Sequence, residues 1–341
     1  MKHKLGKAVM LLVVFLVLAG CSQSNHLIAK SMEKEDINRS FWLAYWDLDA
    51  GGKDLVKMGN KAGKLVYFGA YYDELDRLFI PVAIREIKSE HKRKKMPYET
   101  YLSFVNDKKV IDGTVVLKDT EVLRRLLSNE ASMDKHIDDI IAMTLEGGYD
   151  GLEIDYERVW KDEPVGQLFL RFVNKLYPRA RDKNLKVRVV LEPNTPFAST
   201  AFANGPEYVV MFYNLYGMHS GPGPKANKTF IQTLLTQMDR LPGEKSVAFA
   251  TGGCVWGSNG KKQLVTEAEA QVLSATYDAV PQRDKDSQSQ FFEYENDGVH
   301  YQVWYADVKT LNYWSSLAKE RGIYKISLWR LGGNRDLNKI I

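Results

Sequence analysis

YDGLEIDYE, residues 149–157, carries acids at three alternate positions: Glu153, Asp155 and Glu157. Successive side chains of a β-strand point to opposite faces of the sheet, so a strand here would present all three acids on one face and apolar residues on the other. A buried face that carries only carboxylates is costly, because each charge loses hydration and repels its neighbours. Packing alone gives no reason for the pattern, which therefore predicts a strand whose acidic face has a chemical role.

The acidic stretch is the fourth of eight short runs with the composition of β-strands. They are residues 41–46, 64–72, 100–106, 149–157, 186–193, 208–214, 245–253 and 325–332. Helices are predicted between them by apolar residues at three- and four-residue spacing, over residues 120–127, 132–146, 165–182, 228–238 and 266–278. Eight strands with intervening helices predict an α/β fold, a (β/α)8 TIM barrel. An open doubly wound sheet is the alternative on the pattern alone.

The C-terminal part of the chain predicts an insertion before the eighth strand. QFFEYENDGVHYQVWY, residues 290–305, is typical of a β-hairpin that turns at Asn296, Asp297 and Gly298, and a helix follows over 308–321. We interpret this segment as a small α+β hairpin insertion. Only twelve residues follow Trp329, so the last barrel helix is expected to be short or missing.

The first twenty residues have the pattern of an export signal. Three lysines precede an apolar stretch, residues 8–18, which is too short to span a membrane as a helix. LAGC, residues 18–21, resembles a bacterial lipobox, in which the cysteine, here Cys21, becomes the new N-terminus and carries lipid. A plain cleaved signal with an incidental cysteine is the alternative.

These features divide the chain into a lipoprotein signal peptide over residues 1–20, a polar tether over 21–39 and one folded domain over 40–341. A body of this length suits one large domain better than two. We expect the protein to be exported and held on the outer side of the bacterial membrane through its N-terminal lipid.

Charge and composition argue against several kinds of partner. The chain has 47 Lys+Arg and 43 Asp+Glu, and removing three signal lysines leaves 44 against 43, a net charge of +1. Nucleic acid binding therefore has no electrostatic basis. We interpret the basic run KSEHKRKK, residues 88–95, as a solvated loop, with contact to anionic wall polymer as the alternative. Neither Cys/His metal spacing nor a phosphate-binding glycine loop is found, so no metal and no cofactor is expected.

Carboxyl groups at a strand end match the needs of glycosidic bond cleavage, which requires one acid kept protonated beside another that stays charged. Four segments carry a family resemblance: DGLEIDYE (150–157), VMFYNLYGMHSGPGP (210–224), YQVWYAD (301–307) and ISLWRLGG (326–333). They resemble glycoside hydrolase family 18, the chitinase-like barrels, and its bacterial cell-wall and spore-cortex N-acetylglucosaminidases. The family motifs D-G-x-D-x-D-x-E and M-x-Y-D are matched with two departures, Glu153 and Asn214, while Met211 and Tyr213 are retained.

The resemblance implies retaining, substrate-assisted hydrolysis of β-1,4-linked N-acetylglucosamine glycans such as peptidoglycan or chitin. Glu157 would be the proton donor, and the 2-acetamido oxygen of the substrate would attack the anomeric carbon. Asp155 would orient the acetamide, and Tyr213 would donate a hydrogen bond to its oxygen. Asp150 and Glu153 would lie deeper and hold Asp155 in place. Asp155 and desolvation are expected to raise the pKa of Glu157.

The remaining candidates concern sugar binding and the second departure from the family pattern. Asn214 would stand beside the acetamide, where its amide can hydrogen-bond without adding charge. Trp329 would form the floor beneath the reacting sugar. Further candidates for sugar contact are Trp46, Trp160, Trp256, Tyr216 and Met211. For the first three of these, packing competes evenly with sugar stacking.

Three other interpretations stay open. The acids form a structural network if they pair with Arg158, Arg188 or Arg330. Within enzymes, an endo-acting N-acetylglucosaminidase on N-glycans would use the same catalytic residues with a different groove. Outside enzymes, a non-catalytic glycan-binding surface protein would keep the barrel without turnover.

Overall fold

The computed structural model describes residues 38–109 and 114–341. The signal peptide, lipidation at Cys21 and the tether as far as residue 37 lie outside the described residues and stay predictions. Within the described part, the first strand begins at Asn38.

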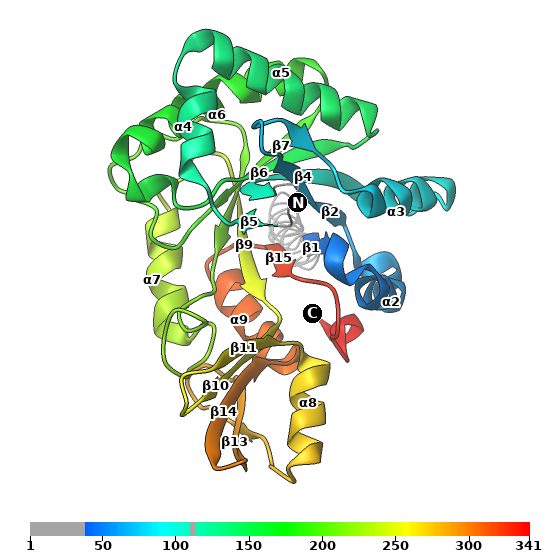
Figure 1. Ribbon diagram of the computed structural model, residues 1–341, viewed down its shortest axis with the longest axis vertical. Coiled ribbons are helices and arrows are strands. Elements are labelled where there is room, and N and C mark those ends of the chain that lie inside the picture. Colours follow the sequence, from blue (N-terminus) through cyan, green and yellow to red (C-terminus); the bar gives the residue numbers. More distant parts are fainter. Residues whose placement is uncertain (1–37, 110–113) are drawn as a thin grey trace, which may run out of the picture. The chain divides into compact units, whose positions relative to one another are not determined.

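Eight parallel strands of the described chain close into a barrel. They are β1 (Asn38–Ala44), β2 (Lys64–Tyr72), β4 (Glu99–Lys109), β6 (Gly151–Asp155), β7 (Lys186–Leu191), β8 (Glu207–Met211), β9 (Glu244–Ala250) and β15 (Lys325–Trp329). Pairing of β1 with β15 and of β2 with β4 completes the ring. Short antiparallel strands β3 (Leu78–Phe79) and β5 (Val115–Val116) extend β2 and β4. The predicted TIM barrel is confirmed, and closure excludes the open doubly wound sheet (Figure 1).

Helices surround the barrel, and five of the predicted ones lie close to the predicted limits. The described helices that follow barrel strands or precede β15 are α2 (Leu48–Met58), α3 (Val82–Arg93), α4 (Thr120–Leu127), α5 (Glu130–Glu146), α6 (Glu163–Asp182), α7 (Lys228–Met238) and α9 (Val308–Lys319). After β15 the described chain forms only η4 (Leu337–Lys339). The expectation of a short or missing last helix is therefore confirmed.

Two helices, α2 and α3, were not predicted. In α2, the adjacent residues Gly51 and Gly52 weaken the helical pattern of the sequence. Gly51 packs against β1, where a Cβ atom would lie 2.5 Å from Leu43 Cδ1. Close approach of the helix to the barrel thus requires a residue that lowers its helix propensity.

Helix α3 contains most of the basic run, so the interpretation of residues 88–95 as a solvated loop was wrong. Lys88 and His91 are buried against the barrel. The Lys88 ammonium donates to Gly148 O at 3.0 Å and Thr100 Oγ1 at 3.1 Å. Part of the basic charge is therefore satisfied inside the fold, which leaves fewer lysines on this face for an anionic polymer.

The insertion before β15 is larger than predicted. It forms a second sheet with the strand order β11 (Lys262–Val265), β10 (Gly252–Gly257), β14 (Val299–Ala306), β13 (Gln290–Asn296), β12 (Gln282–Arg283). The predicted hairpin is confirmed, because Asn296 pairs with Val299 across Asp297 and Gly298. Both turn residues have positive φ, 49° and 72°, as two-residue hairpins prefer.

Helix α8 (Glu267–Thr276) belongs to this insertion and was wrongly expected to cover the barrel. It packs on the second sheet, as Figure 1 shows. Their shared core consists of Val255, Val265, Ala270, Phe292, Val303 and Tyr305. The insertion therefore has its own small hydrophobic core beside the barrel.

A buried ionic layer crosses the barrel interior. Arg188 of β7 lies between its register partners Glu153 of β6 and Glu207 of β8. Its Nε is 3.0 Å from Glu153 Oε2, and its NH1 is 3.9 Å from Glu207 Oε1. Two serine hydroxyls accept from the guanidinium at 2.8 and 3.0 Å, and Lys64 forms a further ion pair with Glu207. Because both ends of the guanidinium are compensated, the charges can stay buried.

Candidate active site

Asp155 and Glu157 lie at the carboxyl end of β6, the face on which TIM barrels place their functional residues. Asp155 is buried, with 8% of its surface exposed. Its Oδ1 has no hydrogen-bond partner among the described residues. Burial, followed by the charges of Glu157 and Glu153, raises the pKa of Asp155 well above its ordinary range. The protonation of Asp155 is therefore coupled to that of Glu157, and the two acids titrate as a pair.

The backbone of Glu157 is fixed by a side chain that the sequence did not single out. Its N–H donates to Asn106 Oδ1 at 2.9 Å, and Asn106 Nδ2 donates to Glu157 O at 3.0 Å. Asn106, in β4, is buried. The next residue, Arg158, has a φ of 62° and donates its N–H to Glu192 Oε2 at 2.7 Å. These contacts hold the turn that follows β6, so Glu157 stands at the barrel mouth on a fixed backbone.

The carboxylate of Glu157 forms an ion pair with Lys118, which precedes α4. The Lys118 N–H also donates to Asp107 Oδ1 at 2.7 Å. Burial raises the pKa of Glu157 and Lys118 lowers it, and the net direction is upward. Burial alone would lower the pKa of Lys118, but Glu157, Asp155 and Glu192 raise it. The acid is thus held by one ammonium group and retains a pKa above that of an ordinary glutamate.

Replacing Lys118 by methionine is expected to shift the alkaline limb of the pH profile of kcat/KM to higher pH. Without the ammonium, the pKa of Glu157 rises further, and a proton donor then stays protonated to higher pH. Rates on a chito-oligosaccharide between pH 4 and pH 9 would show the shift. Lys135→Met, at an exposed surface position, is the control. An unchanged limb, or one moved to lower pH, would contradict this assignment.

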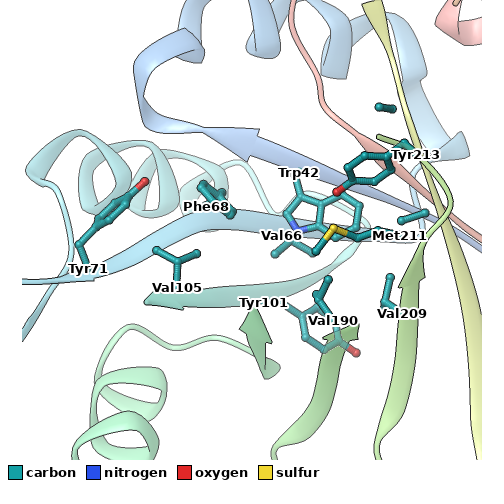
Figure 2. Packing of buried hydrophobic residues seen from close by; sticks show 12 residues of the cluster. Trp42, Val66, Phe68, Tyr71, Tyr101, Val105, Val190, Val209, Met211 and Tyr213 are labelled. Atoms are coloured by element: carbon teal, nitrogen blue, oxygen red, sulfur yellow. The ribbon is translucent and has the colours of Figure 1, made fainter. Parts of the chain in front are cut away.

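Tyr213 lies two residues beyond β8 and is buried. Burial, followed by the charges of Asp155, Glu157 and Glu153, raises its pKa well above the ordinary tyrosine value. The hydroxyl therefore stays protonated and is able to donate a hydrogen bond. Figure 2 shows the Tyr213 ring beside Trp42 and Met211, which belong to the same buried cluster.

Glu153 lies one inward-facing position below Asp155. Its Oε1 accepts a hydrogen bond from Trp42 Nε1 at 2.6 Å, and its Oε2 faces Arg188. Burial raises the pKa of Glu153, while Arg188 and Trp42 lower it; the net direction is upward. Among the three arginines considered as partners, Arg188 thus pairs with an acid of the motif, and the acid concerned is Glu153.

Trp329 and Trp46 provide an aromatic surface near the barrel mouth. Trp329, at the end of β15, is partly buried and meets Phe68 at a ring separation of 4.7 Å and Trp42 at 5.9 Å. Trp46 is 49% exposed, with its ring 6.5 Å from that of Trp329. Both line a cavity of about 450 Å³. An exposed indole next to a cavity is suited to stacking against a sugar face.

Two other tryptophans have packing roles. The expected sugar contact of Trp256 was wrong, because its side chain is buried, whereas the contact expected of Trp160 stays a prediction. Trp160 packs edge-on against Phe169 and Phe202 at ring separations of 5.9 and 6.1 Å. Trp256 is buried in β10, and its Nε1 donates to Gly217 O and Ser220 O. Trp256 therefore fixes the loop that follows β8.

The structure also corrects the role expected of Asp150. This residue precedes β6 at the end opposite Asp155, and its Oδ2 accepts from Thr100 N and Oγ1, both at 2.8 Å. It fixes the start of the strand and does not hold Asp155. Asn214 is exposed with a φ of 67°, and Tyr216 is 36% exposed on the same loop; their expected contacts with a glycan stay predictions.

The described residues contain no group of three or more His, Cys, Asp or Glu side chains arranged to hold a metal ion. In the same residues, every helix is too short or too polar to cross a bilayer.

The side chains at the barrel mouth can supply proton transfer and hydrogen bonding. These side chains are Asp155, Glu157 and Tyr213. A closed barrel with such a carboxyl pair at its fourth strand belongs to the class of TIM-barrel proteins that includes glycosidases.

Comparison with curated proteins gives distant relatives, of which one is named a glycosylase and another a lytic enzyme. The chain is 23% identical over 261 residues to the uncharacterized glycosylase YvbX of Bacillus subtilis, covering 72% of this chain and 74% of that protein. It is 25% identical over 246 residues to the cortical fragment-lytic enzyme of the same organism, covering 64% of this chain and 53% of that protein. The chain thus spans about half the length of the second relative. No family model matches the chain.

Solved structures share the fold. The spore cortex-lytic enzyme SleL of Bacillus cereus gives a TM-score of 0.75 at 18% identity, covering 89% of this chain and 72% of that one. A chitinase from Chromobacterium violaceum gives a TM-score of 0.74 at 18% identity, covering 88% of this chain and 96% of that one. A class V chitinase from Nicotiana tobaccum in complex with NAG4 gives a TM-score of 0.69 at 16% identity, covering 89% of this chain and 97% of that one. The resemblance to glycoside hydrolase family 18 is confirmed, and the prediction of a glycoside hydrolase is supported.

Proposed function

We propose that this protein hydrolyses β-1,4-linked N-acetylglucosamine glycans with retention of stereochemistry, through substrate assistance, with Glu157 as the proton donor. The observation that carries the proposal is the pair formed by Asp155 and Glu157 at the barrel mouth, both with raised pKa values. A carboxyl group that stays protonated near neutral pH is what a general acid in glycoside cleavage needs.

In the first step, Glu157 protonates the departing glycosidic oxygen while the acetamide oxygen of the same sugar attacks the anomeric carbon. The C–O bond to the leaving sugar breaks and a cyclic oxazolinium ion forms. Asp155, with its free Oδ1, accepts a hydrogen bond from the acetamide N–H and stabilises the positive charge. Tyr213 donates to the acetamide oxygen and holds it below the ring carbon.

In the second step, Glu157 takes a proton from water, which attacks the anomeric carbon and opens the oxazolinium ring. The hydroxyl arrives on the face from which the first sugar left, so the configuration is retained. Trp329 and Trp46 support the sugar during both steps. Glu153 enters neither step, because Arg188 and Trp42 already engage its carboxylate.

Reducing-end release from purified peptidoglycan, chitin oligomers and a glycoprotein tests the proposal against its rivals. Release from either of the first two supports it. Release from the glycoprotein alone favours an endo-acting N-acetylglucosaminidase on N-glycans. Binding to any of the three without release favours a glycan-binding protein. The anomeric form of the first product, followed by NMR before mutarotation, tests retention.

We also propose that the protein is exported and anchored by lipid at Cys21, which the lipobox-like LAGC sequence supports. Metabolic labelling with a radioactive fatty acid should mark the wild-type chain. The Cys21→Ser chain should lose the label and leave the membrane fraction. Equal labelling of the two chains would refute the anchor.

A further inference from the structure

Lys225 is a partly buried lysine on the loop that leads from β8 to α7. Leu215 N–H donates to Lys225 O at 3.0 Å, which folds the loop back toward the residues that follow Tyr213. Among the described residues, its ammonium group forms neither an ion pair with a carboxylate nor a hydrogen bond with another acceptor. Burial lowers the pKa of Lys225, and Cys254 partly opposes this effect.

Lys225 lines the cavity of about 450 Å³ that is also lined by Trp46 and Trp329. The rest of the wall comes from the start of β10, from the segment between β11 and α8, and from the chain after β15. Because the cavity shares the aromatic surface with the proposed sugar site, a glycan held on Trp329 would extend into it.

The other charged groups of this cavity already have partners. Arg330 forms an ion pair with Asp47. The carboxylate of Glu269 accepts from Thr266 N at 2.7 Å and from Thr266 Oγ1 at 2.9 Å at the N-terminus of α8. Lys225 is therefore the cation of the cavity without a protein counter-ion in the described chain. A partly buried cation without a counter-ion is unfavourable, and a ligand carboxylate would compensate it.

We propose that Lys225 binds a carboxylate carried by the glycan next to the sugar that lies on Trp329. The inference rests on the proposed function and specifies its substrate class: glycans in which N-acetylglucosamine alternates with an acid-bearing sugar, as in peptidoglycan, are preferred over neutral chitin. The carboxylate is supplied either by the lactyl group of muramic acid or by the stem peptide attached to it. Both sources offer the same charge-assisted hydrogen bonds.

Three forms of one glycan strand test the proposal: a strand freed of stem peptides, the same strand with its lactyl carboxylates converted to methylamides, and the strand with stem peptides intact. Wild-type protein should have a higher kcat/KM on the free-acid or the peptide-bearing strand than on the amide. Lys225→Met should reduce this preference about tenfold, mainly through KM. Lys225→Arg keeps the charge and should keep most of the preference.

The matched control is Lys228→Met, three residues along the chain at an exposed position, which should leave the preference as in the wild type. Preference for the free-acid strand identifies the lactyl group, and preference for the peptide-bearing strand alone identifies the stem peptide. An equal rate on all three strands, or a preference that Lys225→Met does not reduce, overturns the inference while the proposed function stands.

Cleavage of none of the strands, and of no chitin oligomer, would defeat the proposed function instead. Calorimetric binding of the free-acid and amide strands to Glu157→Gln protein then decides the inference. Tighter binding of the acid, lost in the Glu157→Gln/Lys225→Met protein, supports it. Equal affinity for the two strands contradicts it.

Discussion

Glu157→Gln should lower kcat on a chito-oligosaccharide by about 10²–10⁴-fold. Glutamine keeps the shape of the side chain and the backbone contacts with Asn106, but its amide cannot give a proton to the departing oxygen. Initial rates of reducing-end release at the optimum pH measure the loss.

Glu146→Gln is the matched control, because it makes the same substitution at an exposed glutamate at the end of α5. It should retain wild-type activity, and circular dichroism should show the same fold for both variants. Undiminished turnover by Glu157→Gln would remove Glu157 from the mechanism, and with it the role given to Lys118.

Arg188→Met should lower the free energy of unfolding by about 3–5 kcal/mol. The guanidinium compensates Glu153 and Glu207, both of them buried in the barrel. Removing it leaves the buried carboxylate of Glu153 without a cation and leaves Glu207 with Lys64 alone. This loss is larger than the stabilisation that packing of the methionine side chain provides. Urea denaturation followed by tryptophan fluorescence measures the change.

The control for this variant is Arg181→Met, because Arg181 has an exposed side chain near the end of α6. A loss below about 1 kcal/mol for Arg188→Met would show that the ionic layer contributes little to stability. If Arg188→Met does not fold, Glu153→Gln provides a milder test. It removes one charge but leaves an amide facing Arg188 and Trp42, and it should destabilise by a smaller amount.

The barrel strands could be predicted because each is a short apolar run, and the fourth also carries a pattern that packing does not explain. β2 begins and ends at the predicted residues, and the acids of 149–157 lie where a two-residue period places them. The opposite face of β6 is buried as well: Leu152, Ile154 and Tyr156 are at most 2% exposed. Periodicity determines which face a residue occupies, so these features follow from local sequence.

Contacts between distant segments could not be predicted. Asn106 and Lys118 reach Glu157 from 51 and 39 residues away in the chain, and neither has a local motif. Helix α8 has the periodicity of a barrel helix, but its apolar side packs on the second sheet and not on the barrel. The local sequence around each tryptophan also does not show whether its side chain is exposed, as in Trp46, or buried, as in Trp256. Burial depends on what lies across the fold, and one sequence does not give that information.

The second sheet leaves and rejoins the barrel through single residues. Thr251 separates β9 from β10, and Asp307 separates β14 from α9. Asp307 also accepts from Thr310 N at 2.9 Å as the N-cap of α9. The stretch between the two junctions thus has its own core, yet Trp256 ties it to the loop after β8. A change of length or sequence in this stretch would therefore reshape the loops around the mouth, while the acids of β6 keep their register in the barrel.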